Sequence, residues 1–379
     1  MKMHKSLRLV WGASLLGLCL GTVRAQEVVT VGAANPLTGS LAAMGKDAEN
    51  GARLAVEEIN ASGLSIGGQP VTLKLDGKDD AADPRTATTV AQSLVDDNIV
   101  AIIGHLNSGA SIPASKIYSG SGIVQISTAT NPAYTQQGFK TTFRAMATDA
   151  QQGPALAAYA VDTLHAKRVA VVDDATTYGQ GLADQFSQAV KAKGVEVVSR
   201  DATNDHTIDY RAILTRIKGE KPDVIMFGGA DAGAGPFVKQ AQQLGIVAKI
   251  VGGDGICTEK LAELAGPASR NVVCSEAGAA LDKMPGGPAF KVRYEKRYGQ
   301  PIQAYAPYNY DAVYVVVDAM KRANSTDKAK ILAAMPSTDY KGVTGEIAYE
   351  PNGDLKHGVI SIFTYVNGKQ KLLTEMQPQ

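Results

Sequence analysis

The chain has 379 residues, of which 45% are hydrophobic and 20% charged, and its formal net charge is +1 with neutral histidines. This composition is typical of a soluble globular protein, and the length favours two domains over one. Because the sequence has no basic patch and no run of like charges, nucleic acids and membrane surfaces are not expected partners.

Residues 1–25 have the features of a secretory signal peptide. Basic residues precede an apolar run, Leu9–Leu20, that is shorter than the ~20 residues of a membrane-spanning helix. Small residues precede the end of the segment, so we expect cleavage after Ala25 and export of a chain that is not inserted in a membrane. A lipoprotein signal with Cys19 as the lipidated residue is the alternative, and the bulky Leu18 disfavours it. Cleavage removes four basic residues and leaves 34 basic and 37 acidic ones, a net charge of −3.

Apolar, β-branched runs recur every few tens of residues and predict strands. They start at Val28, Val71, Val100, Gly122, Arg168, Val195, Asp223, Lys249 and Asn271. Helical patterns lie between them, at 44–60, after the N-cap Asp83 with Pro84, and at 210–217. This alternation predicts an α/β protein whose parallel sheets are covered by helices on both faces. Helices at 290–298 and 308–322 and short strands at 345–349 and 359–365 complete the expected pattern.

Two expected strands end in turns that are rich in small hydroxyl residues. GHLNSG follows the strand that starts at Val100, and STATNP follows the strand that starts at Gly122. Ligands of open parallel sheets bind outside the carboxyl ends of the strands, where helix N-termini favour an anion. Ser108, Thr128 and Thr130 could add hydroxyl donors, so together the turns predict a site for a carboxylate. Taken singly, Ser108 could be only an N-cap and Thr130 only a turn residue.

The second half of the chain has three comparable turns, at 171–181, 227–237 and 251–258. They contain Asp173, Asp174, Tyr178, Asp231 and Asp254. Carboxylates at these strand ends would suit an ammonium group, although each aspartate could instead cap a helix. Asp254 lies between glycines and is the hardest of them to explain as a cap.

Cys257 and Cys274 are the cysteines that remain after cleavage. Two cysteines in an exported protein are more often bonded than free, so a disulfide is expected, with two buried thiols as the alternative. A metal site is not expected, because no histidine lies near them in the sequence.

Sequence signals of an enzyme are missing. No G-x-G-x-x-G follows a strand, no G-x-S-x-G or H-E-x-x-H occurs, and GSLAAMGKD lacks the spacing of a phosphate-binding loop. We therefore expect no catalytic residue and no cofactor. His105 lies in one of the turns, but a lone histidine at a strand end is more often structural.

Several segments, taken in order, resemble the periplasmic leucine/isoleucine/valine-binding proteins that serve ABC importers. They are VGAANPLTGSLAAMGKDAENGARLAVEEIN, DDAADPRTA, IIGHLNSGASIPAS, YGQGLA, GGDG and APYNYDAV. The resemblance implies the type I periplasmic binding protein fold, in which two doubly wound parallel-sheet lobes are joined by three hinge crossovers. It places the crossovers near 145–148, 276–278 and 354–358. Lobe 1 would then comprise 26–146 plus 277–355, and lobe 2 would comprise 147–276 plus 356–379.

The resemblance also implies roles for single residues. Ser108 and the second turn would hold a ligand carboxylate, Asp254 would hold its ammonium group with Asp231 in reserve, and Tyr178 and Tyr305 would line the pocket. The full set of expected ligand-binding residues is Met44, Leu106, Asn107, Ser108, Thr128, Ala129, Thr130, Tyr178, Ala230, Asp231, Asp254 and Tyr305. The sequence departs from the family's branched-chain binders at three of these: Met44 and Ala230 replace tyrosines, and Asp254 replaces a glutamate.

Three functions are compatible with these observations. The favoured one is a monomeric periplasmic receptor that captures a branched-chain or other aliphatic amino acid and delivers it to the membrane permease of an ABC importer. The second is the same fold with a different ligand, such as an amide, urea or an aromatic acid. An exported enzyme is the third, and the missing catalytic motifs disfavour it. Asp254 separates the first two, because a ligand without an ammonium group gains nothing from a buried carboxylate.

Overall fold

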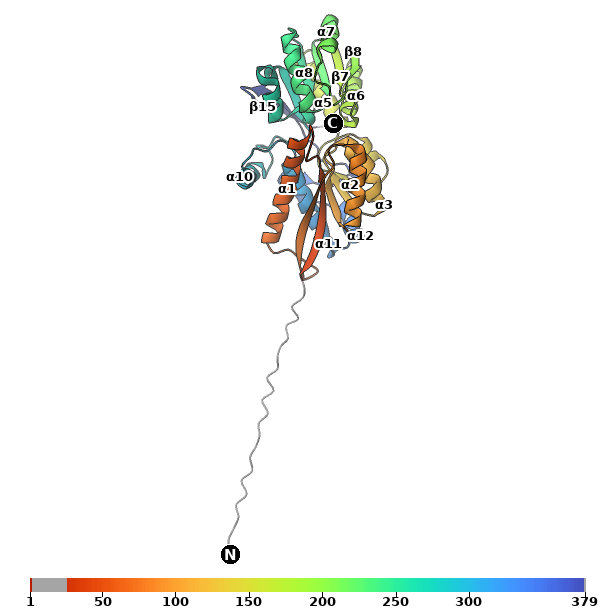
Figure 1. The fold of residues 1–379 in the computed structure, drawn as a ribbon, viewed down its shortest axis with the longest axis vertical. Helices are drawn as coiled ribbons and strands as arrows, with labels where there is room; N and C mark the ends of the chain where they lie inside the picture. Colours follow the sequence, from red (N-terminus) through yellow and green to blue (C-terminus); the bar gives the residue numbers. More distant parts are fainter. Residues whose placement is uncertain (2–25, 378–379) are drawn as a thin grey trace.

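The computed structural model describes Met1 and residues 26–377, which form two lobes, each built on its own sheet (Figure 1). The predicted signal peptide and the alternative lipidation at Cys19 fall on residues 2–25 and lie outside the described residues. None of the helices in the described part of the chain is long and apolar enough to cross a membrane.

The first lobe contains a six-stranded sheet in the order β2-β3-β1-β4-β5-β6. Its strands are β1 (Glu27–Asn35), β2 (Ser65–Ile66), β3 (Gln69–Asp79), β4 (Ala101–Gly104), β5 (Val124–Ser127) and β6 (Thr142–Arg144). All neighbours are parallel except the short β2, which pairs antiparallel with β3.

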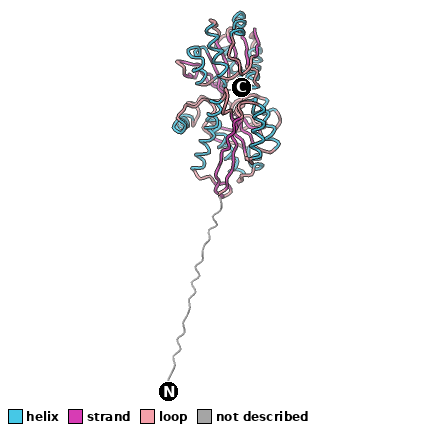
Figure 2. Tube along the Cα trace, in the orientation of Figure 1, coloured by secondary structure: helices cyan, strands magenta, loops and turns pink. Residues whose placement is uncertain are grey.

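Helices cover both faces of this sheet (Figure 2). They are α1 (Ala42–Ala61), α2 (Pro84–Asp96), α3 (Ser108–Gly120), α4 (Ala133–Gln136), α10 (Gly287–Tyr298), α11 (Ala306–Ala323) and α12 (Lys328–Ala334). The apolar side chains of α1, α10 and α11 join those of β1, β3, β4 and β5 in one buried core, so a late stretch of the chain completes the first lobe. The small antiparallel pair β12 (Tyr340–Lys341) and β13 (Glu346–Ile347) follows α12.

The second lobe contains a seven-stranded sheet in the order β15-β14-β11-β10-β9-β7-β8. Its strands are β7 (Arg168–Asp173), β8 (Glu196–Ala202), β9 (Val224–Gly228), β10 (Lys249–Gly252), β11 (Val272–Glu276), β14 (Ile360–Val366) and β15 (Lys369–Met376). Its helices are α5 (Asp149–Ala158), α6 (Thr177–Ala192), α7 (Arg211–Glu220), α8 (Asp231–Gln243) and α9 (Glu259–Ala265).

The predicted alternation of strands and helices is confirmed, and so is the N-cap at Asp83, whose side chain accepts hydrogen bonds from the N–H groups of Arg85 and Thr86. The expected parallel sheets are confirmed, with antiparallel strands at one edge of each: β2 in the first lobe, and β14 and β15 in the second. β14 and β15 form a hairpin whose turn contains Asn367 and Gly368, both with positive φ. β15 was not among the expected strands because this edge strand has mostly half-exposed or exposed side chains and lacks an apolar run.

The chain passes between the lobes three times: from β6 to α5, from β11 toward α10, and from the segment after β13 into β14. At the second passage Gly278 lies against Tyr308, where a Cβ atom would be 1.8 Å from the phenol oxygen, so only glycine fits. The exact residues at which each lobe begins and ends stay a prediction.

Cys257 and Cys274 are both buried, and their Cα atoms lie 5.3 Å apart, within the range that a disulfide requires.

We predict that mass spectrometry of the non-reduced mature protein shows the two cysteine peptides linked. The cross-link spans 17 residues and should contribute about 3 kcal/mol to the free energy of unfolding, because it restricts the unfolded chain. A Cys257→Ala/Cys274→Ala variant should therefore melt at a lower temperature. Two alkylatable thiols in protein purified from the periplasm would contradict the bond.

Candidate ligand-binding site

A small cavity lies between the lobes, where the carboxyl ends of the parallel strands of both sheets meet. It holds about 330 Å³ of empty space. Its lining residues are Leu41, Met44, Leu106, Asn107, Ser108, Thr128, Ala129, Thr130, Tyr178, Ala230, Asp254, Gly255 and Tyr305. The structure thus brings together every residue expected at the site except Asp231, and it adds Leu41 and Gly255.

The two turns of the first lobe form one wall of the cavity. Ser108 is the first residue of α3, whose N-cap is Asn107, so the alternative role of Ser108 as an N-cap is wrong. The Ser108 hydroxyl instead accepts a 3.3 Å hydrogen bond from the N–H of Asn131, and the Thr128 hydroxyl donates to the Leu106 carbonyl at 3.2 Å. These bonds cross from one turn to the other and hold the two together.

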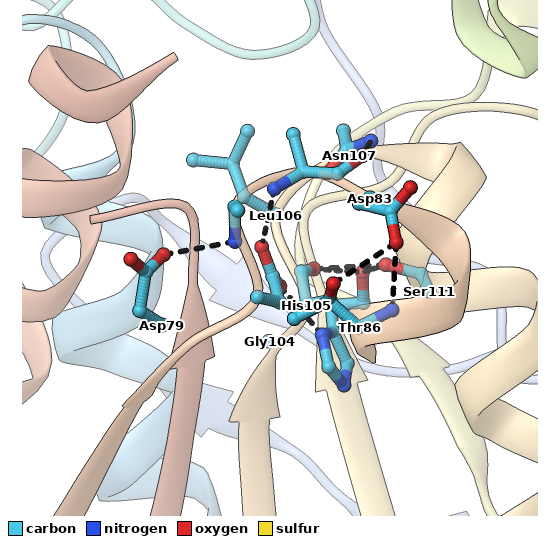
Figure 3. Close-up of polar contacts among 12 residues, drawn as sticks. Asp79, Asp83, Thr86, Gly104, His105, Leu106, Asn107 and Ser111 are labelled. Carbon is cyan, nitrogen blue, oxygen red and sulfur yellow. Dashed lines mark hydrogen bonds and ion pairs between the residues drawn. The ribbon is translucent and has the colours of Figure 1, made fainter. Parts of the chain in front are cut away.

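His105 stabilises the first turn from behind. Its ring is buried, with Nδ1 2.6 Å from an Asp80 oxygen and Nε2 3.1 Å from the Tyr118 hydroxyl. In Figure 3 the ring lies on the opposite side of the turn from the side chains of Leu106 and Asn107, which line the cavity. The expectation of a structural role for this histidine agrees with its position.

Asp254 lies on the opposite wall, two residues after the end of β10, and it is buried. One carboxylate oxygen accepts hydrogen bonds from Gln152 (2.9 Å) and Tyr178 (3.0 Å), and the other accepts one from Tyr305 (2.8 Å). Burial raises the pKa of Asp254, and these three donors oppose that rise because they stabilise the charged form. Burial and the charge of Asp254 raise the pKa of both phenols well above the ordinary value, so Tyr178 and Tyr305 remain donors.

Asp149 and Gln152, at the start of α5, belong to the same network but were not expected there. The Gln152 amide nitrogen lies 3.2 Å from Asp149 and 2.9 Å from Asp254, and its oxygen accepts a bond from Ser275. Burial, together with the nearby charge of Asp254, raises the pKa of Asp149 to about 8. No sequence signal marked these residues, since an aspartate at the start of a helix is commonly only a capping residue.

Asp231 does not line the cavity. It is the first residue of α8, and its carboxylate accepts a 2.7 Å bond from Thr258. Burial raises its pKa to about 6. It lines a separate hollow with Lys260, so its expected role as reserve partner for an ammonium group is not supported by its position.

The cavity offers chemically different surfaces to a ligand. The N–H of Thr130 has no acceptor among the described residues, and with the N-terminus of α3 it provides donors for an anion. Asp254 provides a carboxylate for a cation, while Leu41, Met44, Leu106 and Ala230 provide apolar contact. In the described part of the chain, no three His, Cys, Asp or Glu side chains are grouped as metal ligands.

Comparison with known proteins identifies relatives along almost the whole chain. A model of the periplasmic binding protein family matches residues 28–369. An amino acid binding protein of Pseudomonas aeruginosa is 35% identical over 347 residues, which cover 91% of each chain. Leu/Ile/Val-binding protein homolog 1 of Brucella abortus is 34% identical over 330 residues, which cover 86% of this chain and 88% of the relative.

A solved structure agrees in fold. LivJ, the branched-chain amino acid transporter substrate binding protein of Streptococcus pneumoniae in complex with isoleucine, superposes with a TM-score of 0.85 at 29% identity. The match covers 93% of this chain and all of that one. The chain is therefore a member of the periplasmic binding proteins, within the family of the branched-chain amino acid-binding proteins of ABC transporters.

Proposed function

We propose that this protein is a periplasmic receptor that closes its two lobes over an amino acid and delivers it to the membrane permease of an ABC importer. A branched-chain or other aliphatic amino acid is the favoured ligand. The proposal includes export by the signal peptide, a monomeric receptor, and a cavity that performs no catalytic step and needs no cofactor.

One observation carries the proposal: a buried carboxylate, Asp254, and a set of anion-binding donors line the same small cavity. Both ends of an α-amino acid lose water when they enter such a cavity, and an unpaired buried charge is very costly. Asp254 on one lobe can pair with the ammonium group, and the turns of the other lobe can hold the carboxylate. A ligand with only one of these groups would leave part of the site unpaired.

The rest of the cavity suits an aliphatic side chain. Leu41, Met44 and Leu106 contribute apolar surface, and the small Ala230 leaves room beside them. Met44 and Ala230 also remove the phenol groups that the family's branched-chain binders carry at these positions, so the side-chain preference has to be measured.

Calorimetry on protein that has been unfolded and refolded to remove carried-over ligand should include aliphatic amino acids, their amides, urea and benzoate. Tight binding of an uncharged amide without any amino acid would favour the alternative function.

The catalytic alternative has no support in the geometry. His105 is buried against Asp80 and Tyr118 and does not line the cavity. The Ser108 hydroxyl, which does line it, accepts its hydrogen bond from the backbone of Asn131. In the part of the chain that the structure describes, no base is therefore hydrogen-bonded to this serine, as a nucleophilic mechanism would require.

We predict that Asp254→Asn weakens amino acid binding by roughly 3 kcal/mol, over a hundredfold in Kd. The substitution keeps the shape of the side chain and removes the charge that pairs with the ammonium group. Ser108→Ala should cost less, about 1–2 kcal/mol, because backbone N–H groups still hold the carboxylate. Calorimetry gives both values, and Asp231→Asn is the matched control, which should bind almost as the parent does because Asp231 does not line the cavity.

The order of these effects is the test. Unchanged binding by Asp254→Asn would mean that the ammonium group is held elsewhere. If Asp231→Asn lost as much affinity as Asp254→Asn, the choice of Asp254 as the ammonium partner would be contradicted.

We predict that the ligand closes the lobes. Bonds already cross between them in this structure, from Tyr305 to Asp254 (2.8 Å) and from Asn131 to the Thr177 carbonyl (2.8 Å). Only a closed arrangement can grip both ends of a zwitterion, so ligand should shift the population toward it. Small-angle scattering of stripped protein should show a smaller radius of gyration at saturating ligand. Asp254→Asn at the same ligand concentration should stay open, and an unchanged radius for the parent would contradict this hinge.

A further inference from the structure

Arg144, at the end of β6, is fully buried directly behind the second turn of the site. Its Nη1 donates to the Ala129 carbonyl, and its Nη2 donates to the Asn131 carbonyl (3.2 Å) and to the Thr135 hydroxyl (3.0 Å). Its Nε donates to Asp354 at 2.9 Å. Four of the five guanidinium N–H groups are therefore used, and two of them fix the backbone of the turn.

The contact with Ala129 determines where the next N–H group points. The carbonyl of Ala129 and the N–H of Thr130 belong to one peptide unit, and in a planar trans unit they point in opposite directions. Because Arg144 holds the carbonyl on the buried side, the Thr130 N–H points away from the guanidinium group. That N–H has no acceptor among the described residues, and Thr130 lines the cavity.

The same arginine reaches the third passage between the lobes. Its backbone N–H donates to the Gly353 carbonyl at 2.9 Å, and its side chain pairs with Asp354. Asp354 also accepts a 2.8 Å hydrogen bond from the Thr135 hydroxyl. The buried guanidinium group of Arg144 thus connects the third passage, α4 and the second turn. Lysine could not replace this arrangement, because its ammonium group is a single point and cannot reach several carbonyls in a fixed plane.

We propose that Arg144 is a positioning residue for the anionic end of the ligand: it holds the carbonyls of Ala129 and Asn131 so that the Thr130 N–H faces the ligand's carboxylate. This inference rests on the proposed function only in requiring a ligand with a carboxylate. It does not depend on the ammonium partner.

The experiment compares the affinity for the best carboxylate ligand with the affinity for its amide, measured by calorimetry and by displacement. Arg144→Lys should weaken the carboxylate ligand more than tenfold and change the amide less than threefold, so the ratio of the two affinities falls. Thr135→Val removes one acceptor of the guanidinium group at nearly constant volume, and it should lower the same ratio by a smaller factor. It also keeps the test usable if Arg144→Lys does not fold. The control, Asp354→Asn, leaves both turn carbonyls bonded and should change the ratio by less than threefold.

A second measurement reports on the turn itself. Hydrogen exchange of ligand-free protein should be faster in the peptide that covers 127–132 for Arg144→Lys than for Asp354→Asn, because only the first variant releases the carbonyls. Equal losses for the carboxylate ligand and its amide, at comparable melting temperatures, would reduce Arg144 to a structural residue and overturn the inference. A parent protein that binds an aromatic acid but no amino acid would overturn the proposed function and still allow this comparison. A parent that binds no carboxylate at all would overturn both.

Discussion

The burial of the Asp254 carboxylate between two lobes is the constraint around which the site is arranged. A charge in this position is tolerated only with several donors, and the three that the structure supplies come from different helices: Gln152 from α5, Tyr178 from α6 and Tyr305 from the start of α11. Tyr305 belongs to the other lobe, so the stabilisation of this one charge depends on the lobes being together. A cationic ligand group at Asp254 would add to that dependence.

The opposite wall of the cavity presents backbone N–H groups instead of a charged side chain. Backbone N–H groups that face the cavity without an acceptor are donors that a ligand can use, provided that their peptide units cannot turn. Ser108 and Thr128 tie the two turns to each other, and Arg144 ties the second turn to the sheet edge and to the third passage. Arg144 therefore links the second turn directly to the third passage between the lobes.

Much of the fold could be predicted because it depends on local pattern. Apolar runs of β-branched residues form strands, the Asp83-Pro84 pair starts a helix, and the turns after β4 and β5 carry small polar residues. The edge hairpin of β14 and β15 could not be predicted in the same way. The residues of the edge strand β15 are half-exposed or exposed, so its sequence has no continuous run of apolar residues. The antiparallel direction of this strand depends on the turn at Asn367 and Gly368.

For the site, the sequence by itself determined which turns follow strands and which side chains those turns carry. The turns supplied Ser108, Thr128, Thr130, Tyr178 and Asp254, and the resemblance to the family supplied further residues that line the cavity, such as Met44, Ala230 and Tyr305. Only the tertiary structure showed that Asp254 lines the cavity and Asp231 does not, because both aspartates follow a parallel strand and differ in which way their side chains point. It also revealed Asp149, whose pKa is raised by the charge of Asp254, 105 residues further along the chain, and Arg144, which pairs with Asp354, 210 residues away. Such electrostatic interactions depend on distance in space, which the local sequence pattern does not determine.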